Sequence, residues 1–173
     1  RINDSTYTAE LYISYNWTPG TYNWYLTATD NAGNYTPPSP LSRGGITLTT
    51  AATINDEPYF TIQHALNSAN ANDIINVQAG TWTGEGNRGL VWPDTDGITL
   101  QGVSSADSIL DAGMQDRHIR NNYDTRMKLK DIQFINGNPG RGAAAGEVTG
   151  NGAVVYMYYN GSTQRLTIDN CII

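Results

Sequence analysis

Cysteine is almost absent from this sequence, in which Cys171 is the only one. A single cysteine excludes a disulfide within the chain, and it excludes a zinc site built from several cysteines. A lone cysteine among apolar residues is usually a small buried side chain, which is the role we expect for Cys171. Neither internal crosslinks nor a cysteine-bound metal therefore contributes to the expected fold.

Charged residues are also scarce, at 15% of the chain, and the net charge is −6. General nucleic-acid binding requires a basic surface, so this acidic balance argues against that role. No apolar run reaches the roughly 18 residues that span a bilayer, and we expect no membrane span in these residues. Thr, Asn and Gly are abundant instead, which favours strands and turns. The composition therefore predicts an all-β protein.

Two alternating segments near the N-terminus predict a hairpin of half-buried strands, formed by residues 7–13 and 22–28 with a turn at residues 18–21. The stretch from Gly20 to Asn34, GTYNWYLTATDNAGN, resembles the last strands of immunoglobulin-like and fibronectin-type modules. Tyr22 stands where that family places its tyrosine corner. The resemblance implies a partial immunoglobulin-like β-sandwich at the start of the chain.

A Pro- and Gly-rich segment, residues 37–45, follows this module. Proline lacks the N–H group that a sheet ladder needs, and it stiffens an extended spacer. We therefore expect the C-terminal part of an immunoglobulin-like module at residues 1–36, a linker at residues 37–45 and a second domain at residues 46–173. The chain opens on Arg1 and closes on apolar strand residues, which indicates a fragment of a longer protein.

One helix is predicted after the linker, at residues 61–70, with Thr61 as its N-cap. Its apolar residues recur with helical spacing and share one face: Ile62, Ala65, Leu66 and Ala69. We expect this face to cover the first of the strands that follow, which would otherwise present an unpaired edge.

Four short strands of one type follow the helix, at intervals of about 20 to 40 residues, a spacing typical of stacked repeats. They are Ile75-x-Val77, Ile98-x-Leu100, Met127-x-Leu129 and Leu166-x-Ile168. One coil cannot bury its apolar residues alone, whereas stacked coils can. We expect one parallel sheet in which the second apolar residues are buried and aligned, namely Val77, Leu100, Leu129 and Ile168. Asp131 and Asn170 should then occupy equivalent turns.

Residues 59–66, 73–82, 97–102 and 108–113 resemble the opening of pectin-lyase-like proteins; they read YFTIQHAL, DIINVQAGTW, GITLQG and SILDAG. The resemblance implies a right-handed parallel β-helix with an N-terminal cap helix. It implies less about function, because one fold can carry many activities. Both polysaccharide-cleaving enzymes and non-catalytic surface proteins share this fold.

The first candidate binding site is a basic strand, in which Arg126, Lys128 and Lys130 alternate with apolar residues. The three cations should share the outer face of one strand, where they could hold the carboxylates of an acidic polysaccharide or another cell-surface glycan. The alternative is a solvated strand face whose charges are balanced by Asp116, Asp124 and Asp131.

Aromatic residues supply the second candidate site, with Trp92 and Tyr158 as the preferred sugar platforms. Aromatic faces cover the C–H surface of a sugar while their polar tips stay hydrated. Trp82, Tyr156 and Tyr159 are further members of the same group. The alternative is that these side chains belong to the core.

Metal and cofactor sites find little support in the sequence. Asp94 and Asp96 offer two carboxylates, but a calcium site needs six to eight oxygens, and a turn explains both residues. His64 and His118 have no second ligand at metal spacing, so we expect them to be structural. We expect no cofactor here, and calcium only in further coils of the kind that pectate lyases use.

The resemblance to enzymes of this fold leaves two functional hypotheses open. The first is a secreted or cell-surface modular protein that is adhesive or contacts polysaccharide and is non-catalytic in this segment. The alternative is the N-terminal part of an extracellular carbohydrate-active enzyme: a pectate-lyase-like lyase, a glycoside hydrolase or a pectin esterase. Pectin methylesterases place a catalytic Gln at a position that matches Gly152 of this chain. Because the chain has glycine instead of glutamine there, that activity is in doubt. Arg126 resembles the Arg base of pectate lyases, but no carboxylate cluster accompanies it.

Overall fold

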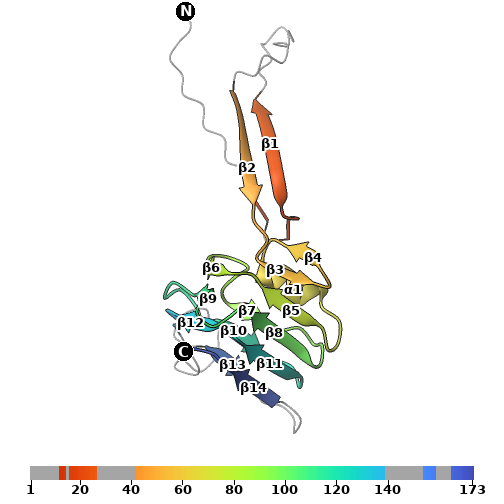
Figure 1. The fold of residues 1–173 in the computed structure, drawn as a ribbon, viewed down its shortest axis with the longest axis vertical. Helices are drawn as coiled ribbons and strands as arrows, with labels where there is room; N and C mark the ends of the chain where they lie inside the picture. The colour runs from red at the N-terminus through yellow and green to blue at the C-terminus, as the bar shows by residue number, and fades with distance from the viewer. Residues whose placement is uncertain (1–11, 15, 27–41, 139–153, 159–164) are drawn as a thin grey trace, which may run out of the picture.

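The computed structural model describes residues 12–14, 16–26, 42–138, 154–158 and 165–173. In these residues the protein is all-β, with many short strands and one helix, α1 (Ile62–Ser68). A two-stranded hairpin projects from a stack of strands, and α1 lies where the two parts meet (Figure 1). Over the described residues no helix has the length and apolar character needed to cross a membrane.

The hairpin consists of β1 (Gly20–Leu26) and β2 (Ser42–Leu48), which pair antiparallel. The predicted partner of β1, residues 7–13, lies mostly outside the described residues, and Ile13 belongs to no strand. The prediction of a linker at residues 37–45 is wrong at its C-terminal end, because residues 42–45 pair with β1. A Cβ at Gly44 would lie 2.4 Å from the Trp24 indole. This glycine therefore serves cross-strand packing rather than chain flexibility.

The turn before β1 is closed by Tyr22, whose hydroxyl donates a hydrogen bond of 2.7 Å to the carbonyl oxygen of Thr18. The Tyr22 ring also packs against Trp17, with ring centroids 5.0 Å apart. The bond joins the tyrosine to the backbone four residues upstream and so fixes the turn against the strand.

Three sheets make up the stack. The largest has the order β14-β11-β8-β5-β3-β4, the second β12-β9-β6 and the third β13-β10-β7. The strands of the largest sheet are β3 (Ala52–Ile54), β4 (Glu57–Tyr59), β5 (Ile74–Val77), β8 (Ile98–Gly102), β11 (Arg126–Lys130) and β14 (Arg165–Asp169). Those of the second sheet are β6 (Gly80–Trp82), β9 (Ser108–Asp111) and β12 (Gln133–Ile135). Those of the third sheet are β7 (Leu90–Val91), β10 (Ile119–Asn121) and β13 (Val155–Met157).

The chain visits the three sheets in a fixed order. A first pass runs through β5, β6 and β7, a second through β8, β9 and β10, and a third through β11, β12 and β13. Strands of successive passes pair in parallel within each sheet. Among the described strands of the stack, antiparallel pairs occur only at the end nearest the hairpin, where β3 pairs with both β4 and β5. Each pass therefore stacks on the one before it.

The register of the largest sheet differs from the predicted one at its first step. Leu100, Leu129 and Ile168 are aligned as predicted, but Leu100 pairs with Ile75. Val77 is buried, yet it pairs with Gly102, so its predicted alignment with Leu100 is wrong by two residues. The predicted burial of Ile168 is also wrong. This side chain is 45% exposed because its strand, β14, is the edge strand of the described sheet.

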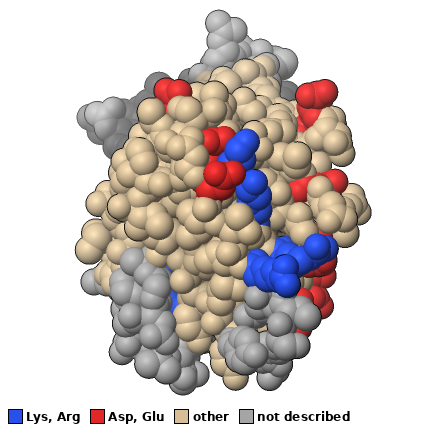
Figure 2. Space-filling view, turned by 60° about the horizontal axis from the view of Figure 1, so that its bottom comes forward, with Lys and Arg blue, Asp and Glu red and all other residues tan. Residues whose placement is uncertain are grey.

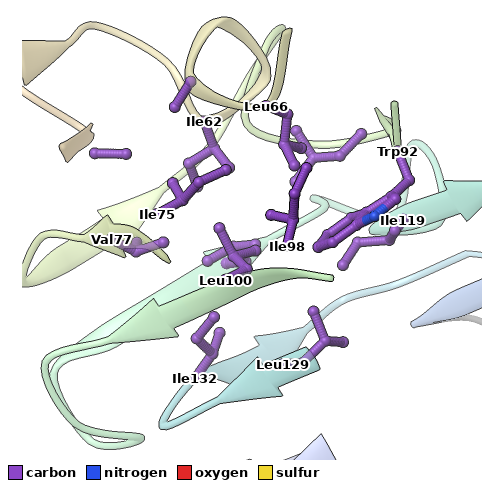
Figure 3. Close-up of a cluster of buried hydrophobic side chains, with 14 of the residues drawn as sticks. Ile62, Leu66, Ile75, Val77, Trp92, Ile98, Leu100, Ile119, Leu129 and Ile132 are labelled. Atoms are coloured by element: carbon purple, nitrogen blue, oxygen red, sulfur yellow. The ribbon is translucent and has the colours of Figure 1, made fainter. Parts of the chain in front are cut away.

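Helix α1 covers the core at the first pass, as predicted. Thr61 is its N-cap, and the Thr61 hydroxyl accepts a hydrogen bond from the backbone N–H of His64. Ile62 and Leu66 are fully buried and point from the helix toward Ile75 and Ile98 (Figure 3). The apolar face of the helix thereby closes the interior that the strands enclose.

Candidate functional site

The outer face of the largest sheet carries the basic strand. In β11, Met127 and Leu129 are buried in the core, so Arg126, Lys128 and Lys130 alternate with them and point outward. The structure therefore brings the three predicted cations together on one strand face. We call the outward residues of β3, β5, β8, β11 and β14 the polar face.

Two rows of side chains run across the polar face, perpendicular to the strands. The paired residues of the first row are Thr53, Asn76, Gln101, Lys130 and Asp169. Those of the second row are Ile74, Thr99, Lys128 and Thr167. Because neighbouring strands lie about 4.8 Å apart, the first row presents a polar group at each strand, and the second row does so except at the apolar Ile74. Sequence reasoning found the cations but not the amides and hydroxyls that continue their rows.

Each cation of the basic strand is paired with a carboxylate. Lys128 Nζ lies 3.1 Å from Asp169 Oδ2, and Lys130 Nζ lies 3.4 Å from Asp131 Oδ2. Lys and Arg atoms accordingly lie beside Asp and Glu atoms, without forming one continuous basic patch (Figure 2). Of the predicted balancing carboxylates, Asp131 has this role. Asp116 instead accepts a hydrogen bond from the backbone N–H of Arg117.

Arg126 makes the most extensive of these pairs, and its partner is Asp96. The Arg126 Nε donates to Asp96 Oδ2 at 2.9 Å, and the Arg126 backbone N–H donates to Asp96 Oδ1 at 2.8 Å. These hydrogen bonds lower the pKa of Asp96 to about 2 and raise the pKa of Arg126. Asp96 is therefore an ion-pair partner of Arg126 at the edge of the basic strand.

Replacing Asp96 with Asn should remove part of the acid sensitivity of the fold. Because the folded pKa is lowered to about 2, the ionised carboxylate stabilises the protein above its unfolded pKa near 4, and this stabilisation is lost as pH falls through about 4 to 2. Thermal melts at pH 6 and pH 2 measure it. The gap in melting temperature between wild type and Asp96→Asn should shrink at the lower pH, and a constant gap would contradict the pairing.

The two preferred aromatic side chains differ in exposure: Trp92 is buried and Tyr158 is exposed. Trp92 is fully buried in the core, so its predicted role as a sugar platform is wrong. Tyr158 is 55% exposed and stays a candidate, although it follows β13 in another sheet and does not belong to the polar face. Tyr156 instead packs on the buried side chain of Arg117, with the guanidinium 4.5 Å from the ring centroid.

Both histidines have structural surroundings, as expected. His118 is buried, and its Nε2 lies within hydrogen-bond distance of the carbonyl oxygens of Leu110 and Ile135. His64, on helix α1, packs edge-on against the ring of Tyr59. Neither ring lies with two further His, Cys, Asp or Glu side chains in a metal-binding arrangement within the described ranges.

Asp131 and Asn170 occupy equivalent turns, as predicted. Both have left-handed backbone, with φ of 54° and 49°, and Asn170 Nδ2 donates a hydrogen bond of 2.6 Å to Asp131 Oδ1. This bond lowers the pKa of Asp131, and the neighbouring Lys130 contributes to the same shift. A general acid near neutral pH needs a raised pKa, so Asp131 is unsuited to that role.

Comparisons with known proteins identify no relative. No family model matches the chain, and neither a curated protein nor a solved structure matches it. The functional argument therefore rests on the residues and on their arrangement.

Proposed function

We propose that the chain is part of an extracellular or cell-surface modular protein that contacts a polysaccharide without cleaving it in this segment. The successive passes through three parallel sheets support a right-handed parallel β-helix, and the resemblance of residues 59–113 to pectin-lyase-like proteins supports the same fold. The Tyr22 hydrogen bond supports an immunoglobulin-like module before it. Modular architectures of this kind suit a surface protein.

The observation that carries the proposal is the pair of polar rows on the outer sheet face. Amide, hydroxyl and charged groups recur there at about 4.8 Å, close to the length of one sugar unit in a linear glycan. Asn76, Gln101 and Lys130 are adjacent members of one row. A chain of sugars lying along the row would meet a donor or acceptor at each unit.

The charge balance of the polar face favours a neutral glycan over a polyanion. Arg126, Lys128 and Lys130 each have a carboxylate partner, so an acidic polysaccharide would have to displace three ion pairs. The net charge of the chain, −6, adds general repulsion toward polyanions. Hydroxyl groups both donate and accept hydrogen bonds, and they can join such ion pairs without breaking them.

The enzyme hypothesis meets a specific obstacle on this face. Asp131 and Asp169 are the two carboxylates beside the polar face that an enzyme could use as a catalytic pair. Asp169 is paired with Lys128, and the lowered pKa of Asp131 keeps that side chain ionised. The lowered pKa of Asp131 therefore does not suit a general acid.

A glycan-binding experiment tests the proposed function. The chain is titrated with hexasaccharides of cellulose, xylan and mannan type and with oligogalacturonate, and binding is followed by NMR. We expect a neutral hexasaccharide to shift the amide signals of β5, β8 and β11, and the double variant Gln101→Ala, Lys130→Ala to weaken its binding at least about tenfold. Thr81→Ala, on the second sheet, is the matched control.

Two outcomes would contradict this proposal. Absence of binding by every glycan would remove the proposed contact, and binding that Gln101→Ala and Lys130→Ala leave unchanged would move it away from the polar face. The same mixtures, assayed for new reducing ends and unsaturated products, should show no cleavage above background. Cleavage would favour the enzyme hypothesis instead.

A further inference from the structure

Two clefts lie at the hairpin end of the stack, beside the loop that joins β6 to β7. Gly84, Gly86 and Gly89 all have left-handed backbone in this loop, with φ of 79°, 80° and 56°. A Cβ at Gly86 would lie 2.9 Å from the Thr61 side chain, and one at Gly89 would lie 2.5 Å from Asp116 Oδ2. Glycine adopts this backbone without strain, and the close contacts at Gly86 and Gly89 leave no room for a side chain there.

Asn87 fastens the loop to the start of the helix. This side chain is buried; its Oδ1 accepts a hydrogen bond of 3.0 Å from the Ile62 N–H, and its Nδ2 donates one of 3.2 Å to the Thr83 carbonyl. The N–H of Gln63 donates to the Gly86 carbonyl at 2.8 Å. The loop is therefore fixed before any ligand binds, which reduces the entropy lost on binding.

A cleft of about 320 Å³, which contains the polar side chains of Gln63, Asn67, Glu85 and Arg88, lies between this loop and α1. Gln63 forms one wall and is held by β7, because its Oε1 accepts from the Val91 N–H at 2.7 Å and its Nε2 donates to the Val91 carbonyl at 2.9 Å. The same Nε2 donates to Asn67 Oδ1 at 2.9 Å, which orients the Asn67 amide. The cleft therefore has a rigid wall that presents amide groups.

Three further groups in the cleft are available to a ligand. The Glu85 carboxylate, the Arg88 guanidinium and Asn67 Nδ2 line it, and none of the three has an ion-pair or hydrogen-bond partner within the described residues. One acceptor group and two donor groups therefore face the same space. Their opposite charges disfavour both a simple anion and a simple cation, whereas neighbouring hydroxyls of a sugar can bond to all three.

An apolar cleft of about 410 Å³ adjoins the first one, because Glu85 lines both. Its walls come from the hairpin and from the stack and include Ile13, Ile46 and Phe60. Apolar and aromatic surface of this kind suits the C–H face of a sugar ring. The two clefts together thus offer polar contacts to one unit of a glycan and an apolar contact to the next.

We propose that the two clefts flanking Glu85 bind consecutive units of a neutral linear glycan. This site lies at the hairpin end of the stack and is separate from the polar face, and its ligand class rests on the function proposed above. Since Phe60 and Glu85 come from the stack while Ile13 and Ile46 belong to the hairpin region, the site needs both parts of the chain. The glycan would therefore also join these two parts.

The test uses the full 173-residue chain and the same neutral hexasaccharides. Glu85→Ala and Arg88→Ala should each weaken binding about tenfold, because each removes a charge-assisted hydrogen bond. Glu57→Ala removes an exposed carboxylate outside both clefts and should leave binding unchanged. The amide signals of Gly86, Arg88 and Val91 should shift on titration in the wild-type chain.

The outcomes separate this site from the polar face. If the hexasaccharides bind and respond to Gln101→Ala and Lys130→Ala but not to Glu85→Ala or Arg88→Ala, the inferred site is wrong and the proposed function stands. If Glu85→Ala and Arg88→Ala weaken binding while the polar-face variants do not, the inferred site stands alone. Equal losses with Glu57→Ala would show that the loss is not specific to the two clefts and would overturn the inference.

Discussion

Leu66→Asp should lower the free energy of unfolding by about 5 kcal/mol, because it removes a buried leucine and places an unpaired charge in an apolar seam. Leu66 is fully buried on the inner face of α1 and belongs to the main core cluster. The helix contacts β3, β4, β5 and β7, so its displacement would open the first pass of the stack. Helix α1 therefore stabilises the whole first pass of the stack and not only its own seven residues.

The neighbouring residue supplies the control. Asn67 is exposed on the same helix, and Asn67→Asp introduces the same charge at almost the same place in the chain. We expect the control to change stability by no more than about 0.5 kcal/mol. Urea denaturation of both variants measures the difference. Equal midpoints for Leu66→Asp and wild type would show that the helix does not close the core.

The inward faces of the strands were predictable from the sequence, but the register of their pairing was not. Alternation decides which side chains point inward, and Ile75, Val77 and Leu100 are all buried as their pattern predicts. A slip of two residues keeps every side chain on its own face, so alternation alone cannot distinguish Ile75 from Val77 as the partner of Leu100. Backbone hydrogen bonding and the turns between strands make that choice.

The boundary of the hairpin shows a different limit. The Pro- and Gly-rich residues 37–45 suggested a linker, because proline lacks the N–H group that a sheet ladder needs and stiffens an extended spacer. In the structure Gly44 lies under the Trp24 indole, and Trp24 is adjacent to it only because β1 and β2 pair. A glycine required by a cross-strand neighbour looks the same in sequence as one required by a turn. The distinction depends on a contact between residues far apart in the chain.

The positions of the three cations in the candidate site were predictable from the sequence, but the carboxylates that pair with them were not. Arg126, Lys128 and Lys130 lie on one outer strand face, as their alternation with apolar residues indicates. Asp96 and Asp169 meet them only through the parallel stacking of separate passes. The ion pairs change the chemistry of the face from a basic patch to a nearly neutral polar surface. Charge counts along the sequence cannot show this.

Trp92 illustrates why aromatic residues are weak evidence for sugar binding in a single sequence. Its flanking residues, Val91 and Pro93, do not decide between exposure and burial. The side chain is buried because it alternates with the buried Leu90 across the exposed Val91, and it lies beside Ile119 (Figure 3). An alternation over three residues is too short to be read with certainty from sequence alone.

Gly102→Ala should destabilise the protein by about 3 kcal/mol, although alanine normally stabilises such a position. Gly102 does not have a left-handed φ, so replacing it would by itself stabilise by up to about 1 kcal/mol through the unfolded state. The expected sign is reversed because a Cβ at Gly102 would lie 2.2 Å from the Asp131 carbonyl oxygen and 2.7 Å from Ser108 Cβ. The added methyl group has no room between successive passes.

Neither neighbour of Gly102 can move at small cost. The Asp131 carbonyl is backbone at the turn after β11, and Ser108 is buried, where its Oγ accepts a hydrogen bond of 2.9 Å from the Val103 N–H. The same Oγ lies 3.2 Å from the Val77 carbonyl oxygen and donates to it, so Ser108 links two passes. Displacing either group would disturb hydrogen bonds between passes, and buried donors left unpaired cost further free energy.

Gly113→Ala is the matched control for this prediction. Gly113 has a left-handed φ of 58°, and no atom lies within 4 Å of a Cβ built there. Alanine at that position should cost about 1 kcal/mol from backbone strain alone. Urea denaturation of both variants therefore compares steric conflict between passes with local strain. If Gly102→Ala is as stable as wild type or more stable, successive passes are not packed as closely as the register of β8 and β11 requires, and the stacking described here is wrong.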